Sequence, residues 1–119
     1  MEMTVYDLRP EVKKVVLVGK LDIAGAQKIE LPMATVSGSK CGVVIDMAGV
    51  DFIASIGLRH LVMAARSVSR NSRKLVLLNP NTLVTEVLVA SGLQEMLPIM
   101  RSEDEAVAAL VPSGDAGSR

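Results

Sequence analysis

The 119-residue sequence contains no tryptophan and only one tyrosine, one phenylalanine and one cysteine. Stacking on nucleic acid bases needs aromatic side chains, so their scarcity argues against a base-stacking site. The single cysteine, Cys41, excludes an intramolecular disulfide and any metal site built from several thiolates. We therefore predict a reducing compartment, the cytoplasm, with Cys41 as a core or near-core thiol.

Strong net charge and long apolar runs are also absent. Thirteen Lys and Arg residues balance thirteen Asp and Glu residues, so no general attraction to nucleic acid or to an anionic membrane is expected. No apolar run approaches the roughly 18 to 20 residues of a membrane span, and the first residues lack the pattern of an export signal. We expect neither nucleic acid nor a membrane among the partners.

What the chain does contain is aliphatic side chains. Apolar residues make up 50% of the sequence, which is enough for one hydrophobic core of Val, Leu, Ile, Ala and Met. We predict one domain over residues 1–112, with no metal site. Residues 113–119, which follow Pro112, are predicted to form a disordered tail.

The order of apolar patterns predicts an α/β fold. Segments 4–8 and 12–18 predict a hairpin around Pro10, and apolar runs at 42–47, 74–78 and 97–100 predict three further strands. Helical spacing predicts three helices, over residues 24–36, over 56–70 and from 82 to a stop at Gly92. The first of them is expected to kink or restart at Pro32. A capping box of Ser102 and Glu105 precedes a last helix. We expect a mixed sheet of about five strands with about four helices mainly on one face.

The segment from Asp46 to Leu58 is the most informative part of the sequence. It leaves a buried strand and enters a helix through a turn, which places Ser55 at or just before the helix N-terminus. Free backbone N–H groups and the positive end of the helix dipole suit a capping hydroxyl or a phosphate there. A third interpretation is a hydrolase with Ser55 as nucleophile and His60 as base, but the separate loop and orienting carboxylate of such sites are missing.

Three carboxylates, those of Asp22, Asp46 and Asp51, fall at predicted strand ends. Carboxylate oxygens suit Mg²⁺, but solvation of strand ends explains these residues better.

Three motifs together resemble the STAS family, in particular its anti-sigma factor antagonists. Gly19-Lys20-Leu21-Asp22 is similar to the family's early Gly-x-Leu-Asp motif. The segment from Asp46 to Leu58 resembles its central signature, in which an aspartate, a short turn, an aromatic and an apolar residue precede Asp-Ser-Ser/Thr-Gly-Leu. Asn79-Pro80 followed by a helix ending in Ser91-Gly92-Leu93 resembles a third feature.

The resemblance implies a non-enzymatic switch protein that acts as a monomer or weak homodimer and carries no cofactor. In the family, the first serine of the signature, which is Ser55 here, is phosphorylated by a partner that is both anti-sigma factor and serine kinase. The unphosphorylated form binds this kinase and frees the sigma factor, and a PP2C-type phosphatase resets the switch. Any nucleotide is expected on the kinase.

The docking surface that the resemblance implies comprises residues of the first two motifs: Leu21, Asp22, Asp51, Ser55, Ile56, Gly57, Leu58 and Arg59. Arg59 and His60 are equally compatible with ordinary surface positions. The sequence departs from the signature at Ala54 and Ile56, where the family has an aspartate and a second Ser or Thr. A non-catalytic scaffold or regulatory module of the same fold, stressosome-like or transporter-associated and without phosphorylation of Ser55, therefore stays open.

Overall fold

Two strands joined by a tight turn at Pro10 begin the sheet. The computed structural model describes residues 1–111 and places β1 at Glu2–Arg9 and β2 at Val12–Leu21. The two strands pair antiparallel, with Val5 opposite Val15. The predicted hairpin is confirmed, whereas the tail predicted over 113–119 lies outside the described residues.

Three further strands continue the sheet: β3 at Gly42–Ile53, β4 at Leu75–Leu78 and β5 at Ile99–Met100. The strand order is β1-β2-β3-β4-β5, and every pair except β1–β2 is parallel. The predicted ends of β2 at Val18 and of β3 at Met47 are wrong, because the two strands stay paired as far as Leu21 and Ile53. Gly19 and Gly49, which follow the predicted strand ends, lie at irregularities of this ladder.

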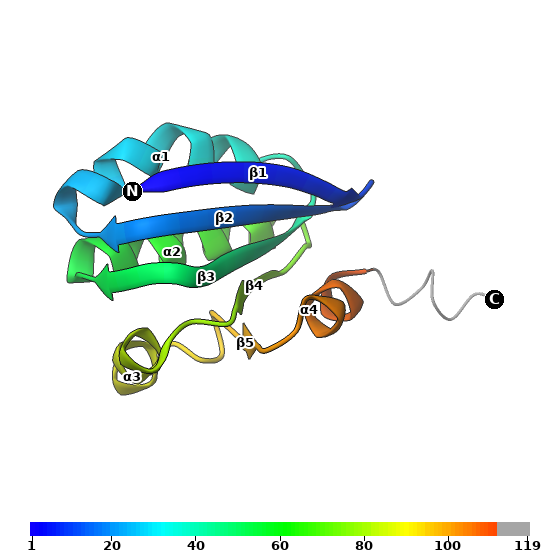
Figure 1. Ribbon diagram of the computed structural model, residues 1–119. Coiled ribbons are helices and arrows are strands. Elements are labelled where there is room, and N and C mark those ends of the chain that lie inside the picture. Colours follow the sequence, from blue (N-terminus) through cyan, green and yellow to red (C-terminus); the bar gives the residue numbers. More distant parts are fainter. Residues whose placement is uncertain (112–119) are drawn as a thin grey trace.

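Four helices pack on the sheet: α1 at Ile23–Ser37, α2 at Ser55–Arg70, α3 at Thr82–Ala90 and α4 at Glu103–Leu110. Figure 1 shows α1 and α2 behind the sheet, with α3 and α4 at opposite ends of the segment that contains β4 and β5. Alternate strand residues such as Leu17 and Ile45 join the core under α1, α2 and α3, and Val44 and Val76 join a smaller core under α4. The prediction of a mixed sheet with helices mainly on one face is confirmed.

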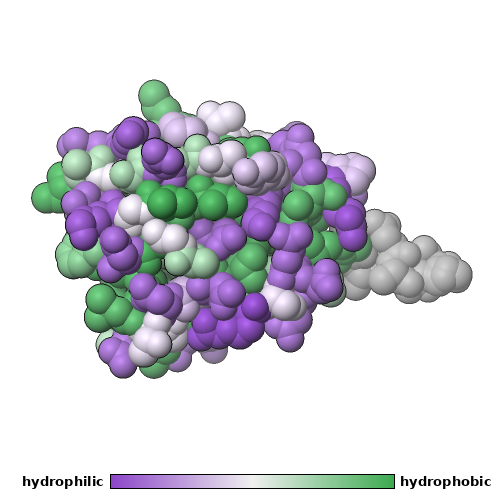
Figure 2. Space-filling model, in the orientation of Figure 1, coloured by the Kyte–Doolittle hydropathy of each residue, from purple (hydrophilic) through white to green (hydrophobic). Residues whose placement is uncertain are grey.

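The face of the sheet turned toward the viewer in Figure 1 carries no broad apolar surface. Figure 2 shows small apolar patches on this side, separated by polar and charged atoms. A salt bridge here joins β2 to the start of α4, because Lys14 Nζ lies 2.6 Å from Glu103 Oε1. This hydrogen bond raises the pKa of Lys14 above its usual value and keeps the ammonium charged.

Two helix ends follow the sequence closely. Ser102 Oγ accepts a hydrogen bond from the Glu105 N–H at 3.1 Å, although the Glu105 carboxylate accepts from the Arg101 N–H instead of returning to Ser102. Gly92 has φ +70° directly after α3, and the Leu93 N–H reaches back to the Leu88 carbonyl, as in a Schellman motif. Both predicted helix boundaries are confirmed.

Helix α1 continues through Pro32, so the predicted restart of the helix is wrong. Proline removes the N–H that would bond to the carbonyl of Lys28, and this loss is costly where the backbone is buried. Pro32 is exposed, and water can therefore satisfy the free carbonyl. The buried face of α1, with Ile29, Met33 and Val36, holds the helix on the sheet despite the missing bond.

Substitution Pro32→Ala is expected to stabilise the protein by about 2 kcal/mol, because proline in a helix interior costs about 3 kcal/mol relative to alanine and the more flexible unfolded chain offsets part of the gain. Urea denaturation followed by circular dichroism measures this change. The exposed Gln27→Ala on the same helix serves as control, with an expected change of less than about 0.5 kcal/mol. A P32A variant no more stable than wild type would contradict this account of α1.

Candidate functional site at the carboxyl ends of the strands

The carboxyl ends of β2, β3 and β4 meet at one edge of the sheet, and each strand passes directly into a helix there. The connections run through Asp22 into α1, through Ala54 into α2 and through the segment 79–81 into α3. Figure 1 shows the ends of β2 and β3 side by side at the left of the view. Functional side chains in open parallel sheets gather at this edge.

The first two of these connections are locked together by backbone contacts. Leu21 and Ile53 are register partners at the ends of their strands, and the Ala54 N–H donates to the Leu21 carbonyl at 3.0 Å. Gly57 lies so close that a Cβ atom there would be 2.6 Å from the Leu21 carbonyl oxygen. Only glycine lets α2 approach β2 this closely.

Ser55 is the first residue of α2, and its side chain is exposed. The N-cap position is Ala54, with φ −100° and ψ 171°, and no side-chain hydrogen bond caps the helix. The interpretation of Ser55 as a capping serine is therefore wrong. Backbone N–H groups of the first turn have no partner within a helix, so the Ser55 hydroxyl stands beside donors that favour an anion.

The other two helices at this edge do have side-chain caps. Asp22 accepts a hydrogen bond from the Gly25 N–H at 2.8 Å, and Asn81 accepts one from the Val84 N–H at 2.8 Å. The Asn81 amide also donates to the Val50 carbonyl at 3.2 Å, which ties the start of α3 to β3. Helix α2 therefore differs from its two neighbours in lacking a cap.

The residues predicted to contact a partner divide by exposure. Asp51, Ser55 and Arg59 are exposed, whereas Leu21 and Gly57 are buried and hold the turn together instead. The others are partly buried: Asp22, Ile56 and Leu58.

Three exposed apolar side chains at the same edge escaped the sequence reasoning. Ile23 is 66% exposed, Phe52 42% and Leu83 54%. Ile23 directly follows the cap Asp22, and Leu83 lies two residues after the cap Asn81. A large apolar residue directly after a cap could have revealed Ile23, but Phe52 is a residue of β3 and no cap signal marks it.

The carboxylates that suggested Mg²⁺ have other partners. Asp22 is occupied as a helix cap, and Asp51 lies 3.7 Å from Lys20 Nζ. Asp46 was expected at a strand end but lies inside β3, where it accepts from the Ala48 N–H at 3.0 Å. Within residues 1–111, no three or more His, Cys, Asp or Glu side chains are grouped as metal ligands.

The hydrolase interpretation finds no geometry to support it. Ser55 and His60 are both on α2, and a separation of five residues puts their side chains about 140° apart around the helix axis. His60 lines a groove between α1 and α2, away from the first turn that carries Ser55.

None of the helices described in residues 1–111 has the length and apolar character needed to cross a membrane.

Comparison with known proteins decides the family. Residues 4–106 match the STAS domain. The chain belongs to the STAS family. One relative, BtrV of Bordetella bronchiseptica, is named as a candidate anti-sigma factor antagonist. It is 32% identical to this STAS protein over 94 residues, which cover 78% of this chain and 81% of BtrV.

Solved structures share the STAS fold over nearly the whole chain. An anti-sigma factor antagonist from Mycobacterium paratuberculosis superimposes with a TM-score of 0.82 at 21% identity, covering 93% of this chain and 94% of that chain. The anti-sigma factor antagonist SpoIIAA in its unphosphorylated form gives a TM-score of 0.74 at 21% identity, covering 89% and 93%. The predicted fold family is confirmed.

Substitution Gly57→Ala is expected to destabilise the STAS domain by about 1–3 kcal/mol or more, because the added Cβ collides with a backbone carbonyl that cannot move freely. Thermal and urea denaturation test this expectation. Gly38→Ala is a matched control, since its Cβ would meet its nearest atom at 3.4 Å. Equal stability of the two variants would show that α2 does not depend on this close approach.

Substitution Ala54→Asp is expected to stabilise the protein by about 1 kcal/mol, because aspartate at the N-cap accepts a free N–H of α2 and its charge favours the helix dipole. Urea denaturation at neutral pH measures the gain. Ala54→Ser separates the two effects, since serine caps without a charge. An A54D variant less stable than wild type would show that the first turn of α2 is satisfied in another way.

Proposed function

We propose that this STAS protein is an anti-sigma factor antagonist that binds an anti-sigma factor serine kinase, with binding controlled by phosphorylation of Ser55. The observation that carries the proposal is the place of Ser55. Its hydroxyl is exposed on the first residue of α2, at the serine position of the family's central signature.

The surroundings of Ser55 suit a protein interface. Apolar side chains of Ile23 and Phe52 are exposed at the same sheet edge, together with the charged Asp51 and Arg59. We name these residues and Ser55 the Ser55 edge. Protein interfaces combine an apolar centre with polar groups at the rim, and aromatic and Arg side chains are frequent anchors.

A phosphate on Ser55 would alter this surface strongly. It adds about −1.5 to −2 charges at neutral pH. In the free protein, the uncapped N–H groups of α2 favour the added charge. In a complex, the phosphate would have to be buried beside apolar side chains, and Asp51 belongs to the same edge. Desolvation and like-charge repulsion then release the partner.

The relatives support the same scheme. BtrV is named for antagonism of an anti-sigma factor, and SpoIIAA has been solved both without and with phosphorylation. We infer that a PP2C-type phosphatase restores the free hydroxyl, that the nucleotide belongs to the kinase, and that the protein itself catalyses no reaction. Cytoplasmic location and a monomeric or weakly dimeric state stay predictions.

The test compares Ser55→Ala and Ser55→Asp in binding to the anti-sigma factor kinase encoded by the same organism, by isothermal titration calorimetry. We expect S55A to bind as wild type does and S55D to bind at least about tenfold more weakly, which corresponds to about 1.4 kcal/mol. Ser69→Asp is the control, because Ser69 is an exposed serine near the other end of the same helix.

Intact-mass measurement of the protein from its own cells completes the test. A phosphate mapped to Ser55, with binding lost in S55D, supports the switch. Equal affinity of S55A and S55D, with protein that stays unmodified under growth and stress, would favour the scaffold module of the same fold.

A further inference from the structure

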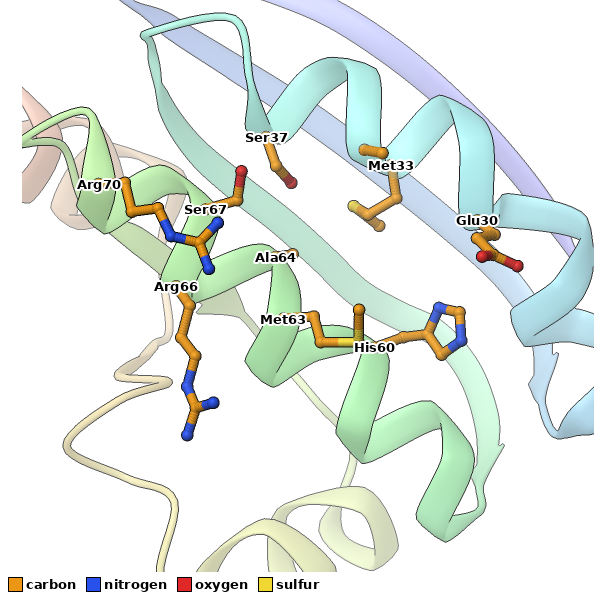
Figure 3. A pocket seen from close by; sticks show the side chains of 10 residues that line it. Glu30, Met33, Ser37, His60, Met63, Ala64, Arg66, Ser67 and Arg70 are labelled. Carbon is orange, nitrogen blue, oxygen red and sulfur yellow. The ribbon is translucent and has the colours of Figure 1, made fainter.

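A groove of about 330 Å³ lies between α1 and α2, on the side of these helices away from the sheet edge that carries Ser55. Figure 3 shows it from close by, with α1 above and α2 below. Its volume is at the lower end of the range for ligand sites. None of the residues of the Ser55 edge lines this groove.

The two walls of the groove present the same residues in the same order. Each helix contributes a Met-Ala-x-x-Ser row, and the six side chains are Met33, Ala34, Ser37, Met63, Ala64 and Ser67. The small alanines make the groove concave, while methionine side chains adapt to irregular apolar partners. Met63 is 57% exposed, so the groove offers apolar surface to solvent.

Charge is distributed unevenly along the groove. Arg66 and Arg70 belong to the end where α1 and α2 terminate, while Glu30 and His60 lie together at the other end (Figure 3). Helix α2 contains no acidic residue, and neither arginine forms an ion pair with another residue in 1–111. Arg70 therefore makes one end of the groove cationic, while the Arg66 side chain extends away from α1 (Figure 3), and the other end carries a carboxylate, although the whole chain has no net charge.

Ser37 provides an independent sign of a missing partner. Its side chain is only 1% exposed, and its hydroxyl is the one buried side-chain oxygen or nitrogen in residues 1–111 without a hydrogen bond. The hydroxyls of Ser37 and Ser67 lie in the space between the two helices (Figure 3). Buried hydroxyls normally have a hydrogen-bond partner, and this one has none among the described residues.

We propose that this groove is a second docking site, separate from the Ser55 edge, for an amphipathic helix of a partner protein with acidic residues in its first turn. The rows from Glu30 to Ser37 and from His60 to Ser67 each span about two helical turns, roughly 10 Å, which suits a short helix segment. Apolar side chains spaced three and four residues apart on that helix pack against the exposed Met63 and Ala34, whereas Met33 is buried and forms the floor of the groove.

The charges also fix the direction of the bound helix. The C-terminal ends of α1 and α2 carry negative partial charge, so the positive N-terminal end of an incoming helix is favoured beside them. Acidic residues of its first turn then lie near Arg70, and its C-terminal end approaches Glu30. The bound helix is therefore antiparallel to α1 and α2. An anionic membrane fits less well, because Glu30 would repel it and the groove is concave.

The experiment titrates the ¹⁵N-labelled full-length protein with a synthetic helical peptide of about 16 residues, carrying Glu in its first turn, Leu and Met at helical spacing on one face, and Lys in its last turn. We expect saturable shifts of amide signals from the α1 and α2 rows. A nitroxide at the peptide N-terminus should broaden signals near Ser37 and Arg70, and a nitroxide at its C-terminus should broaden signals near Glu30.

Matched variants test the charges and the shape of the site. Arg70→Glu should weaken binding about tenfold, whereas Lys28→Glu, an equal charge change outside the groove on α1, should not. A peptide with its terminal charges exchanged should bind the double variant R66E/R70E better than it binds wild type. Ala34→Leu replaces an exposed alanine of the groove and should weaken binding without unfolding the protein. S55D should bind the peptide as wild type does.

Several results would overturn the proposal. Absence of saturable shifts at millimolar peptide would remove the site, and equal binding of the charge-exchanged peptide to wild type would remove charge complementarity. Shifts with inorganic phosphate but not with the peptide would indicate an anion site. Binding to vesicles of phosphatidylglycerol, lost in R66E/R70E while the peptide does not bind, would indicate a membrane surface. Broadening in the opposite order would contradict the antiparallel direction.

Discussion

The pairing of β2 with β3 up to Leu21 and Ile53 is the constraint on which the rest of the site depends. The parallel ladder brings the two strand ends together, and the Ala54 N–H closes the contact by donating to the Leu21 carbonyl. Gly57 then lets the first turn of α2 lie against Leu21. The exposed position of Ser55 is a consequence of this backbone arrangement and does not depend on a side-chain contact of its own.

Helix α2 connects the two surfaces that we propose as partner-binding sites. Its N-terminal end carries Ser55 and Arg59, and its C-terminal half contributes Met63 and Arg70 to the groove with α1. The helix is fixed to the core through Leu61, Ala65 and Val68 on its buried face. These core contacts hold α2 in place along most of its length, so a partner at one end need not disturb the other end.

The order of strands and helices could be predicted from the sequence because the apolar patterns are strong and Gly92 and Ser102 mark helix ends. The length of β3 could not be predicted from the sequence, because glycine is typical of turns. Only the pairing with β2 shows that the strand continues through Gly49. The sequence also could not reveal that α2 lacks a side-chain cap. Serine is a preferred cap, and only the backbone shows that the helix begins one residue after Ala54. The matched walls of the groove appear only once the two helices are placed side by side.

The strand order of the sheet follows the order of the chain, with β1 at one edge and β5 at the other. Each strand after β1 therefore finds a neighbour in a segment that the ribosome has already synthesised. This order keeps each strand close in the chain to its partner, and the domain then folds as one unit. The last strand, Ile99–Met100, pairs through only two residues, so most of the hydrogen-bonded framework exists before it is made.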